Sequence, residues 1–270
     1  MKKFEGMLFC TDLDGTLYSD DKTVSKENLD AIEYFKSEGG LFTFITGRVP
    51  KTSVEIYRTI KPNAPYGCFN GGGIYDPVQE RYLWNITLSQ ESLELVRTVD
   101  RELPEIGIQF NTADQVLFNK DNHALELFRT ITGMPLIPCS YEELKDPLLK
   151  VVFAHDDPEQ IIAIEQLLSA HPKAMNYDFI RSENRLFELL PKGVSKGGAL
   201  CKLAELLNIE MGNTVAVGDY HNDVSMLRAA GMGYAVANAV EEAKAVADRI
   251  TVSNNEHAIA RIVEELAQKV

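Results

Sequence analysis

The chain has 270 residues, of which 45% are hydrophobic, so it is long enough for one large globular domain or two smaller ones; we expect two. Its formal net charge of -13 and the lack of any basic run argue against a nucleic-acid partner, because binding to a phosphate backbone depends on clustered Lys and Arg. No stretch approaches the roughly 18 to 20 apolar residues of a transmembrane helix, and the apolar run at 7–10 is too short for a signal peptide. We therefore expect a cytoplasmic protein with no nucleic-acid and no membrane partner.

The cysteine pattern agrees with this location. The four cysteines lie far apart, mostly within apolar runs, and no two of them form a CxxC pair. Such residues are typical of reduced thiols in the core of a cytosolic protein. They are Cys10, Cys68, Cys139 and Cys201.

The first 80 residues alternate between strand-like and helix-like segments. Because strands separated by single helices form right-handed crossovers, this order predicts a parallel sheet. Strands are expected at 7–10, 41–45 and 66–69, with helices near 27–37 and 52–59 between them. Beyond the glycines at 71–73, paired short strands are expected at 74–75 and 82–86.

Residues 83–189 differ in pattern and are expected to form an inserted α+β domain. Its helices are expected at 91–102, 123–131 and 158–169, and its strands at 106–110, 116–119, 149–154, 175–180 and 186–190. Alternation then resumes with a helix from Ser195, a strand at 214–217, a helix from Asp223, a strand at 233–236 and helices near 241–247 and 256–269. The sequence thus predicts an α/β domain, residues 1–82 and 190–270, interrupted by a second domain, residues 83–189.

Two carboxylates follow the first expected strand, in the segment Asp12-Leu13-Asp14-Gly15-Thr16. A strand that ends there places both acids at the carboxyl edge of the sheet, where open α/β folds bind their ligands. Acids in such a place are suited to holding a metal ion. The alternative is an ordinary strand-to-turn transition, in which Asp, Gly and Thr are also common.

A second polar segment, Thr46-Gly47-Arg48, follows the next expected strand. It places a hydroxyl and a loop of backbone N–H groups at the same edge of the sheet. Such a turn can hold a phosphoryl oxygen. The alternative is a simple β-to-α turn that carries a surface arginine.

A lysine stands at the start of a helix in the C-terminal third. Ser195 is a suitable N-cap, so the Lys196 ammonium projects from the first turn, where the helix dipole disfavours a cation. This local cost favours a functional role, and a solvated lysine is the alternative. Lys192 is a weaker candidate because it precedes the turn.

A third strand end carries the segment Gly218-Asp219-Tyr220-His221-Asn222-Asp223. Capping of the next helix by Asn222 or Asp223 is the structural alternative to a functional role. It does not explain Asp219, which comes too early in the segment. His221 is interpreted as an exposed loop histidine, and the roles of His221 and Tyr220 stay open.

In order and spacing, these segments resemble the four motifs of the haloacid dehalogenase (HAD) superfamily. They are Asp12-Leu13-Asp14-Gly15-Thr16, Thr46-Gly47-Arg48, Lys196 and Gly218-Asp219-Tyr220-His221-Asn222-Asp223. The family has a Rossmann-like core, and residues 83–189 correspond to its mobile cap. Only about 30 residues separate Asp14 from Thr46, so the cap lies after Thr46. This position, the size of the cap and the Asn70-Gly71-Gly72 turn look like the Cof-type sugar-phosphate phosphatases.

The resemblance implies a role for each site residue. Asp12 is the nucleophile, and Asp14 is the general acid and base. A Mg²⁺ ion is held by one Asp12 carboxylate oxygen, the Asp14 backbone carbonyl and the Asp219 carboxylate. Asp223 supports these ligands without contacting the ion. The residues implied in substrate binding are Thr46, Gly47, Arg48, Lys196 and Asn222.

The implied activity is Mg²⁺-dependent hydrolysis of a small phosphorylated metabolite, such as a sugar phosphate, through an aspartyl-phosphate intermediate. The enzyme is expected to be a monomer or weak homodimer. A phosphomutase on hexose phosphates and a non-catalytic sugar-phosphate sensor stay open as alternatives. Ion-pumping ATPases are excluded by the lack of membrane spans, and dehalogenases are disfavoured because their chemistry lacks an acid where this chain has Asp14.

The sequence of the cap does not identify the substrate. Four polar residues near its expected strand ends are candidates for contacting the leaving group, but each is equally typical of a protein surface. They are Asn111, Gln115, Lys150 and Arg185.

Overall fold

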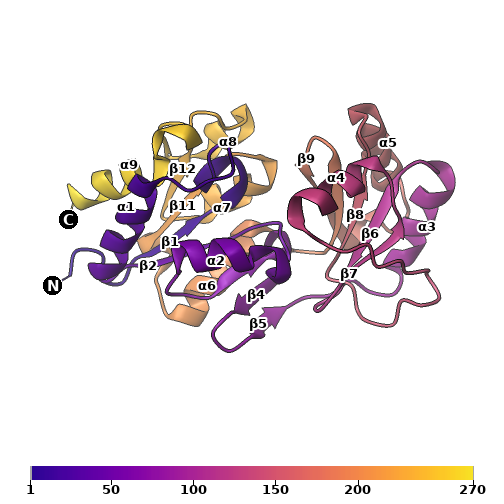
Figure 1. Cartoon of the computed structure of the whole chain (residues 1–270), viewed down its shortest axis with the longest axis horizontal. Helices are drawn as coiled ribbons and strands as arrows, with labels where there is room; N and C mark the ends of the chain where they lie inside the picture. Colours follow the sequence, from indigo (N-terminus) through magenta and orange to yellow (C-terminus); the bar gives the residue numbers. More distant parts are fainter. Residues whose placement is uncertain (1, 270) are drawn as a thin grey trace. The chain divides into compact units, whose positions relative to one another are not determined.

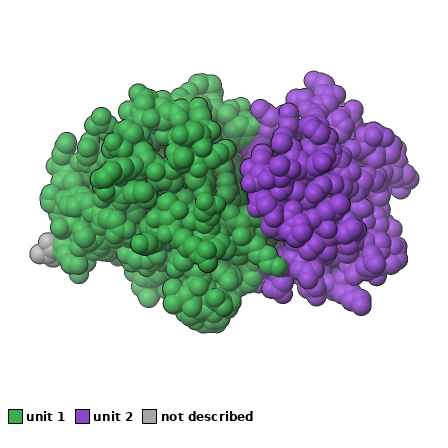
Figure 2. Space-filling view, in the orientation of Figure 1, with its two compact units in different colours: residues 1–84, 195–270 green, residues 85–194 purple. Residues whose placement is uncertain are grey.

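The chain divides into two compact units, drawn in different colours in Figure 2. The computed structural model describes residues 2–269. Unit 1 comprises Met1–Trp84 and Ser195–Val270, and unit 2 comprises Asn85–Val194. The boundaries expected from the sequence, after residues 82 and 189, lie a few residues before the observed ones. The roles of the two units as core and cap stay predictions.

Unit 1 is built around a parallel sheet with the strand order β13-β12-β11-β1-β2. Its strands are β1 (Leu8–Thr11), β2 (Leu41–Phe44), β11 (Thr214–Gly218), β12 (Met232–Ala235) and β13 (Arg249–Ile250). Its helices are α1 (Lys26–Ser37), α2 (Val54–Ile60), α6 (Lys196–Leu207), α7 (Val224–Ala229), α8 (Glu241–Val246) and α9 (Ala258–Ala267). Helix α1 packs against α9, and α6 packs against α7 (Figure 1).

The register of the central strands places their carboxyl ends side by side. Thr11, at the end of β1, lies opposite Phe44 of β2 and Val217 of β11. The residues of β1 and β11 are buried throughout, as expected for parallel strands that are covered on both faces. The loops that leave β1, β2 and β11 therefore start from one edge of the sheet.

A small antiparallel sheet, β3-β4-β5, follows α2. Its strands are β3 (Tyr66–Cys68), β4 (Gly73–Asp76) and β5 (Arg81–Asn85). Strand β3 touches the parallel sheet through the bridge between Ile45 and Gly67, but it pairs with β4 along its length. The expectation that residues 66–69 continue the parallel sheet is therefore confirmed only at this one parallel bridge. The hairpin to β4 supplies nearer partners than the strand across the sheet.

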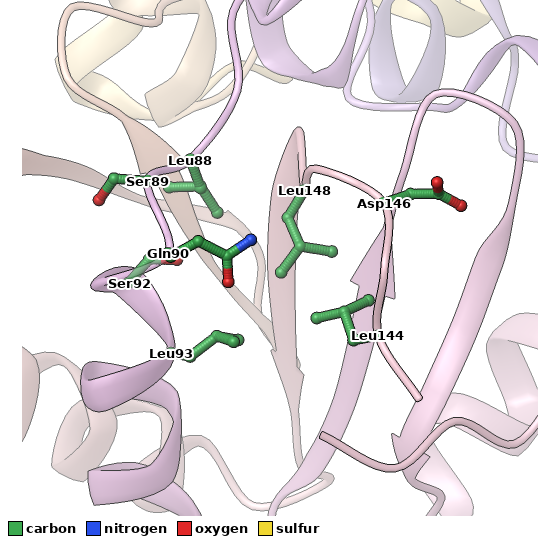
Figure 3. A pocket seen from close by; sticks show the side chains of 8 residues that line it. All are labelled: Leu88, Ser89, Gln90, Ser92, Leu93, Leu144, Asp146 and Leu148. Carbon is green, nitrogen blue, oxygen red and sulfur yellow. The ribbon is translucent and has the colours of Figure 1, made fainter. Parts of the chain in front are cut away.

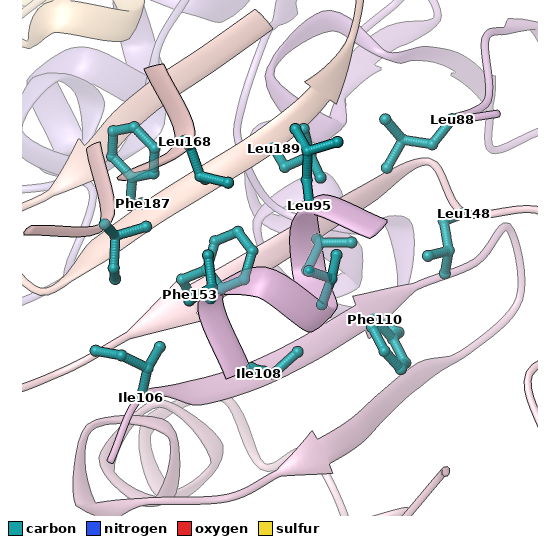
Figure 4. Close-up of a cluster of buried hydrophobic side chains, with 14 of the residues drawn as sticks. Leu88, Leu95, Ile106, Ile108, Phe110, Leu148, Phe153, Leu168, Phe187 and Leu189 are labelled. Carbon is teal, nitrogen blue, oxygen red and sulfur yellow. The ribbon is translucent and has the colours of Figure 1, made fainter. Parts of the chain in front are cut away.

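Unit 2 is built on an antiparallel sheet with the strand order β7-β6-β8-β10-β9. Its strands are β6 (Gly107–Asn111), β7 (Val116–Lys120), β8 (Lys150–Ala154), β9 (Tyr177–Glu183) and β10 (Leu186–Pro191), and its helices are α3 (Ser92–Glu102), α4 (His123–Thr132) and α5 (Pro158–Ser169). Alternate strand residues, such as Ile108 and Phe153, form a hydrophobic core with Leu95 of α3 and Leu168 of α5 (Figure 4). Because side chains alternate along a strand, the other face of β6, β8 and β10 carries Gln109, Lys150 and Glu188 beside apolar residues such as Val152.

The structure differs from the prediction at the start of the last helix and at one cysteine. The last helix begins at Ala258, because His257 takes a left-handed φ of 63° after the turn Asn254–Glu256. Cys201, on α6, is exposed, which corrects its interpretation as a core residue, whereas the other cysteines are buried. Among residues 2–269, no helix combines the length and the apolar character that crossing a membrane requires.

Candidate active site

The loops at the carboxyl edge of the parallel sheet carry most of the predicted site residues. Asp12 directly follows β1, and Asp219 directly follows β11. Thr46 lies just beyond β2, Lys196 opens α6, and Asp223 ends the short turn before α7. The fold thus gathers residues from both ends of the chain at one edge of unit 1.

A buried lysine links two of the carboxylates. The Nζ of Lys196 donates to Oδ1 of Asp12 and to Oδ1 of Asp223, at 2.6 Å each. All three side chains are buried. The Ser195 hydroxyl accepts from the N–H of Gly198 and caps α6 as predicted. Contact with two carboxylates offsets the unfavourable position of a cation at a helix start, so the alternative of a solvated lysine is wrong.

The competing lysine lies elsewhere. Lys192 belongs to unit 2, where its Nζ donates to Oδ1 of Asp178 at 2.7 Å. The ring of His221 lies edge-on to the ring of Tyr220, with the centroids 4.7 Å apart. His221 is exposed, as expected for a loop histidine.

Asp223 stabilises the segment before α7, which includes the short 3₁₀ helix His221–Asp223. Its Oδ2 accepts from the backbone N–H groups of Asp219 and Tyr220, at 3.0 Å each, and α7 has no side-chain cap. Helix capping, the structural alternative for this segment, is therefore confirmed in part, because Asp223 takes part in a capping box on the short 3₁₀ helix His221–Asp223. The Thr16 hydroxyl donates to Oδ1 of Asp219 at 2.8 Å. Gly15, with a φ of 81°, permits this approach, because a Cβ there would lie 2.5 Å from Oδ2 of Asp219.

The cluster holds more acidic than basic groups. Burial raises the pKa of Asp12 well above its ordinary value, Asp223 raises it further, and Lys196 opposes the rise. Burial and Asp223 also raise the pKa of Asp219 to about 7, against the opposing effect of Thr16. Burial alone would lower the pKa of Lys196, but the charges of Asp12 and Asp223 raise it. One lysine therefore faces three acids and does not balance them.

The acidic cluster fits a divalent cation. One oxygen from each of Asp12, Asp219 and Asp223 lies within 4.8 Å of the others. Asp223 is already engaged by Lys196 and by two backbone N–H groups, which leaves Asp12 and Asp219 as the better side-chain ligands. Carboxylate oxygens are the ligands that hard divalent cations prefer, and a cation lowers the electrostatic cost of burying several acids together.

The second acid of the first motif forms a separate ion pair. Arg48 donates from Nε to Oδ2 and from Nη2 to Oδ1 of Asp14, at 2.9 and 2.7 Å, and Lys22 donates to Oδ1 at 3.2 Å. Burial would raise the pKa of Asp14, but the hydrogen bonds and charges of Arg48 and Lys22 outweigh it and lower the pKa. Arg48, predicted to bind substrate, thus contacts Asp14 and lies 5.3 Å from the centroid of the Tyr18 ring.

The remaining substrate-binding candidates lie on two neighbouring loops. The Thr46 hydroxyl is buried and accepts from the N–H of Arg48 at 3.2 Å, across Gly47. The Nδ2 of Asn222 donates to Oδ1 of Asn70 at 3.0 Å. The Oδ1 of Asn222 is buried and has no hydrogen-bond partner among the described residues. It is therefore available to a bound ligand.

Three residues that contact the site were not predicted from the sequence. Thr16 belongs to the first motif, so its position next to the two acids was a usable signal. Asn70 was noted only for the turn it forms, and nothing local indicates its contact with a residue 152 positions away. Lys22 lies in a polar loop that carries no signal at all.

The polar candidates in unit 2 separate into buried and exposed residues. Lys150 is 5% exposed, and its Nζ donates to Oε1 of Glu188 at 2.9 Å. Asn111 is buried beside Gln109, whose Nε2 donates to its Oδ1 at 3.0 Å. Lys150 and Asn111 are therefore not ordinary surface residues. The two exposed candidates are Gln115 and Arg185.

Unit 2 also contains a small cavity, shown in Figure 3. Its volume of about 10 Å³ has room for about one water molecule. The side chains of Leu93, Leu144 and Leu148 converge on it, and the buried hydroxyl of Ser92 in its lining has no hydrogen-bond partner among residues 2–269. A cavity of this size suits a water molecule and not a substrate.

Known proteins resemble this chain over nearly its whole length. Residues 9–263 match the family described as haloacid dehalogenase-like hydrolase. The chain is 28% identical over 267 residues to the 5-amino-6-(5-phospho-D-ribitylamino)uracil phosphatase YitU of Bacillus subtilis, covering 96% of each chain.

Solved structures share the fold. A haloacid dehalogenase-like hydrolase from B. subtilis has a TM-score of 0.83 at 26% identity, covering 98% of this chain and 100% of that one. The HAD subclass IIB sugar phosphatase BT4131 has a TM-score of 0.83 at 21% identity, covering 96% of this chain and 98% of that one. The expected α/β, Rossmann-like HAD fold is thus confirmed. The chain belongs to the haloacid dehalogenase-like hydrolases, as a phosphoric monoester hydrolase of Cof type, and the resemblance seen in its four motifs is confirmed.

Proposed function

We propose that this phosphatase hydrolyses phosphate monoesters of small metabolites with the help of Mg²⁺ and through an aspartyl-phosphate intermediate. The observation that carries the proposal is the cluster in which Lys196 contacts Asp12 and Asp223 while Asp219 lies close to both acids, which leaves an excess of acidic groups. The Asp12 and Asp219 carboxylates and the Asp14 backbone carbonyl would hold Mg²⁺. The ion supplies charge neutralisation for the phosphoryl oxygens when it is bound.

Two displacements at phosphorus make up the proposed reaction. An Asp12 carboxylate oxygen forms a bond to phosphorus while the bond from phosphorus to the ester oxygen breaks, and Asp14 gives its proton to the departing alcohol. A water molecule then attacks phosphorus and gives a proton to Asp14, while the bond from phosphorus to Asp12 breaks. Inorganic phosphate leaves, and both carboxylates return to their initial state.

The other site residues bind and orient the reacting groups. Lys196 holds the Asp12 carboxylate by the bond at 2.6 Å and neutralises charge between it and the phosphoryl group. The Thr46 hydroxyl and the Gly47 N–H donate to the phosphoryl oxygens, and Asn222 donates to them with the second N–H of Nδ2, the first being bonded to Asn70. Arg48 and Lys22 favour the Asp14 carboxylate through their contacts, so the proposal requires Arg48 to leave Asp14 for the substrate before Asp14 takes up the proton that it gives to the alcohol.

Unit 2 is proposed to be the cap that selects the leaving group, with unit 1 as the catalytic core. A phosphorylated sugar or polyol is the proposed substrate class, in line with the names of YitU and BT4131. Cys10, Cys68 and Cys139 are buried and form no disulfide with described residues, which fits the proposed reducing, cytoplasmic location. The enzyme is proposed to be a monomer or weak homodimer.

The test is phosphate release from a panel of sugar and polyol phosphates, with Mg²⁺ and with EDTA. We expect turnover with Mg²⁺ only, and loss of at least about 10⁴-fold in kcat for Asp12→Asn, because no other group there forms the covalent intermediate. Unchanged circular dichroism shows that the variant is folded. Turnover by Asp12→Asn, or in EDTA, contradicts the proposal, and conversion to an isomeric sugar phosphate indicates a mutase.

Asp14→Asn tests the proton-transfer role separately. We expect kcat to fall by about 10²–10⁴-fold with an alkyl phosphate, whose alcohol needs a proton to leave. The fall should be smaller with p-nitrophenyl phosphate, because p-nitrophenolate leaves without one. Equal losses on the two substrates would mean that Asp14 does not protonate the leaving group.

A further inference from the structure

Asn70 contacts two loops that leave different strands of the parallel sheet. Its backbone N–H donates to the carbonyl oxygen of Thr46 at 3.0 Å, and the N–H of the preceding Phe69 donates to the carbonyl oxygen of Arg48 at 3.1 Å. These two bonds hold both ends of the segment 46–48. The turn after β3 therefore fixes the shape of that loop.

The side chain of Asn70 connects this loop to the one after β11. It is fully buried, and its Oδ1 accepts from Nδ2 of Asn222 at 3.0 Å. A Cβ at Gly47 would lie 3.0 Å from Oδ1 and 3.1 Å from Nδ2 of Asn70, so the amide lies directly against the Gly47 backbone. Because its Nδ2 donates to Asn70, Asn222 has one orientation, with its buried Oδ1 left for a ligand.

The backbone at Asn70 is strained. Phe69, Asn70 and Gly71 have consecutive left-handed φ values of 54°, 55° and 100°. This region is unfavourable for phenylalanine, whereas asparagine tolerates it better than most residues. Strained backbone of this kind persists where surrounding contacts hold it in place, often at functional sites. Here those contacts are the bonds to the loop 46–48 and to Asn222.

We infer that Asn70 is a positioning residue, which sets the distance between the Thr46–Arg48 loop and Asn222 and so the width of the phosphoryl pocket. The inference rests on the proposed function of those two loops. Asn70 acts through its neighbours and takes no part in bond making. Its loss should therefore disturb phosphate binding and turnover while the acidic cluster around Lys196 stays intact.

The experiment uses Asn70→Gly, which removes the side chain and leaves a residue that adopts the left-handed region freely. We expect kcat/KM for p-nitrophenyl phosphate to fall by about 10–100-fold, as misplacement by about 1 Å does in other enzymes. Asn208→Gly is the matched control, because Asn208 ends α6 with a φ of 54° and is exposed. It should keep wild-type kcat/KM. An equal, small effect of both substitutions would overturn the inference.

A double-mutant cycle separates positioning from a general structural role. If Asn70 acts by orienting Asn222, the variant Asn70→Gly/Asn222→Ala should be no slower than Asn222→Ala alone. If the double variant instead loses the product of the two single fold-losses, the contact between the Asn70 and Asn222 amides does not cause the effect of Asn70→Gly. Asn70→Asp retains an acceptor at Oδ1 and should recover kcat relative to Asn70→Gly. Equal kcat values for the Asp and Gly variants would count against the inference.

Binding of inorganic phosphate in the presence of Mg²⁺, measured by calorimetry, makes the test independent of turnover. Phosphate should bind about 10-fold or more weakly to Asn70→Gly than to Asn208→Gly. A wild-type protein that releases no phosphate from any substrate would refute the proposed function, while this comparison of affinities still decides the role of Asn70.

Discussion

Each unit buries a lysine against carboxylate groups, and the two clusters differ in charge balance. In unit 2, Lys150 pairs with Glu188 at 2.9 Å across neighbouring strands. In unit 1, Lys196 contacts Asp12 and Asp223 at 2.6 Å each, and Asp219 lies close to both acids. Among the described residues, only the unit 1 cluster gathers three side chains that could hold a metal ion.

The difference indicates which buried charges serve packing and which serve chemistry. A lysine beside one acid neutralises it, and such a pair adds little net stability. Three acids beside one lysine leave negative charge inside the protein, which is costly unless a cation joins them. The imbalance, and not burial itself, distinguishes the proposed active site from the polar face of unit 2. Three measurements test whether the Lys196 cluster and the Lys150–Glu188 pair differ in this way.

Of these three measurements, Lys196→Met has the largest expected effect. The substitution removes the cation that contacts Asp12, so kcat for p-nitrophenyl phosphate should fall by about 10²–10³-fold. The metal-free variant should also be less stable than the wild type, and added Mg²⁺ should restore part of that stability. Phosphate release measures kcat, and thermal unfolding with and without Mg²⁺ measures the stability. More than a tenth of the wild-type kcat would show that Lys196 does not act on the reacting group.

Lys150→Met is the matched change in unit 2 and should affect stability only. Removing one partner of a buried ion pair costs about 3–5 kcal/mol, whereas the double variant Lys150→Met/Glu188→Leu should regain most of that loss. Urea unfolding measures both, and kcat should stay at the wild-type value. A rise in KM without a loss of stability would instead make Lys150 a substrate contact.

Mg²⁺ binding has the smallest expected effect on the wild-type protein. An ion at about 100 times its Kd stabilises the folded state by about 2.7 kcal/mol, which corresponds to a rise in Tm of about 5–10 °C. Asp219→Asn should lose most of this rise, because it removes a ligand and part of the excess negative charge. Glu188→Gln, in unit 2, should keep the full rise. Equal shifts for the two variants would place the Mg²⁺ site elsewhere.

The hydrophobic pattern predicted most helices and strands, because burial of one or both faces leaves a clear period in the sequence. It predicted the strand near residues 66–69 but not its main partner, because this strand pairs with β4 and contacts the parallel sheet through one bridge. The choice of partner depends on long-range contacts that no local pattern records. It missed the exposure of Cys201 for the same reason, since an apolar neighbourhood in the sequence does not show which face of α6 is covered.

The candidate site was predicted mainly through its motifs. The chemistry of Asp12, Asp14, Lys196 and Asp219 follows from residue type, order and spacing at strand ends and a helix start, all of which are local. The hydrogen bonds between the loops were not predictable, because they join residues far apart in the chain. Arg48 and Asn222 were both expected to bind substrate. In the structure Arg48 donates to Asp14, and Asn222 donates to Asn70.

The sequence by itself determined the family, the α/β fold class and the set of reactive side chains, because these depend on residue identity and on the period of hydrophobic residues. Only the tertiary structure decided that one buried lysine faces three acids, that Arg48 holds Asp14, and that Asn70 joins two loops. Charge balance and hydrogen bonding depend on distances across the parallel sheet. Those distances exist only when the strands pair in their observed register.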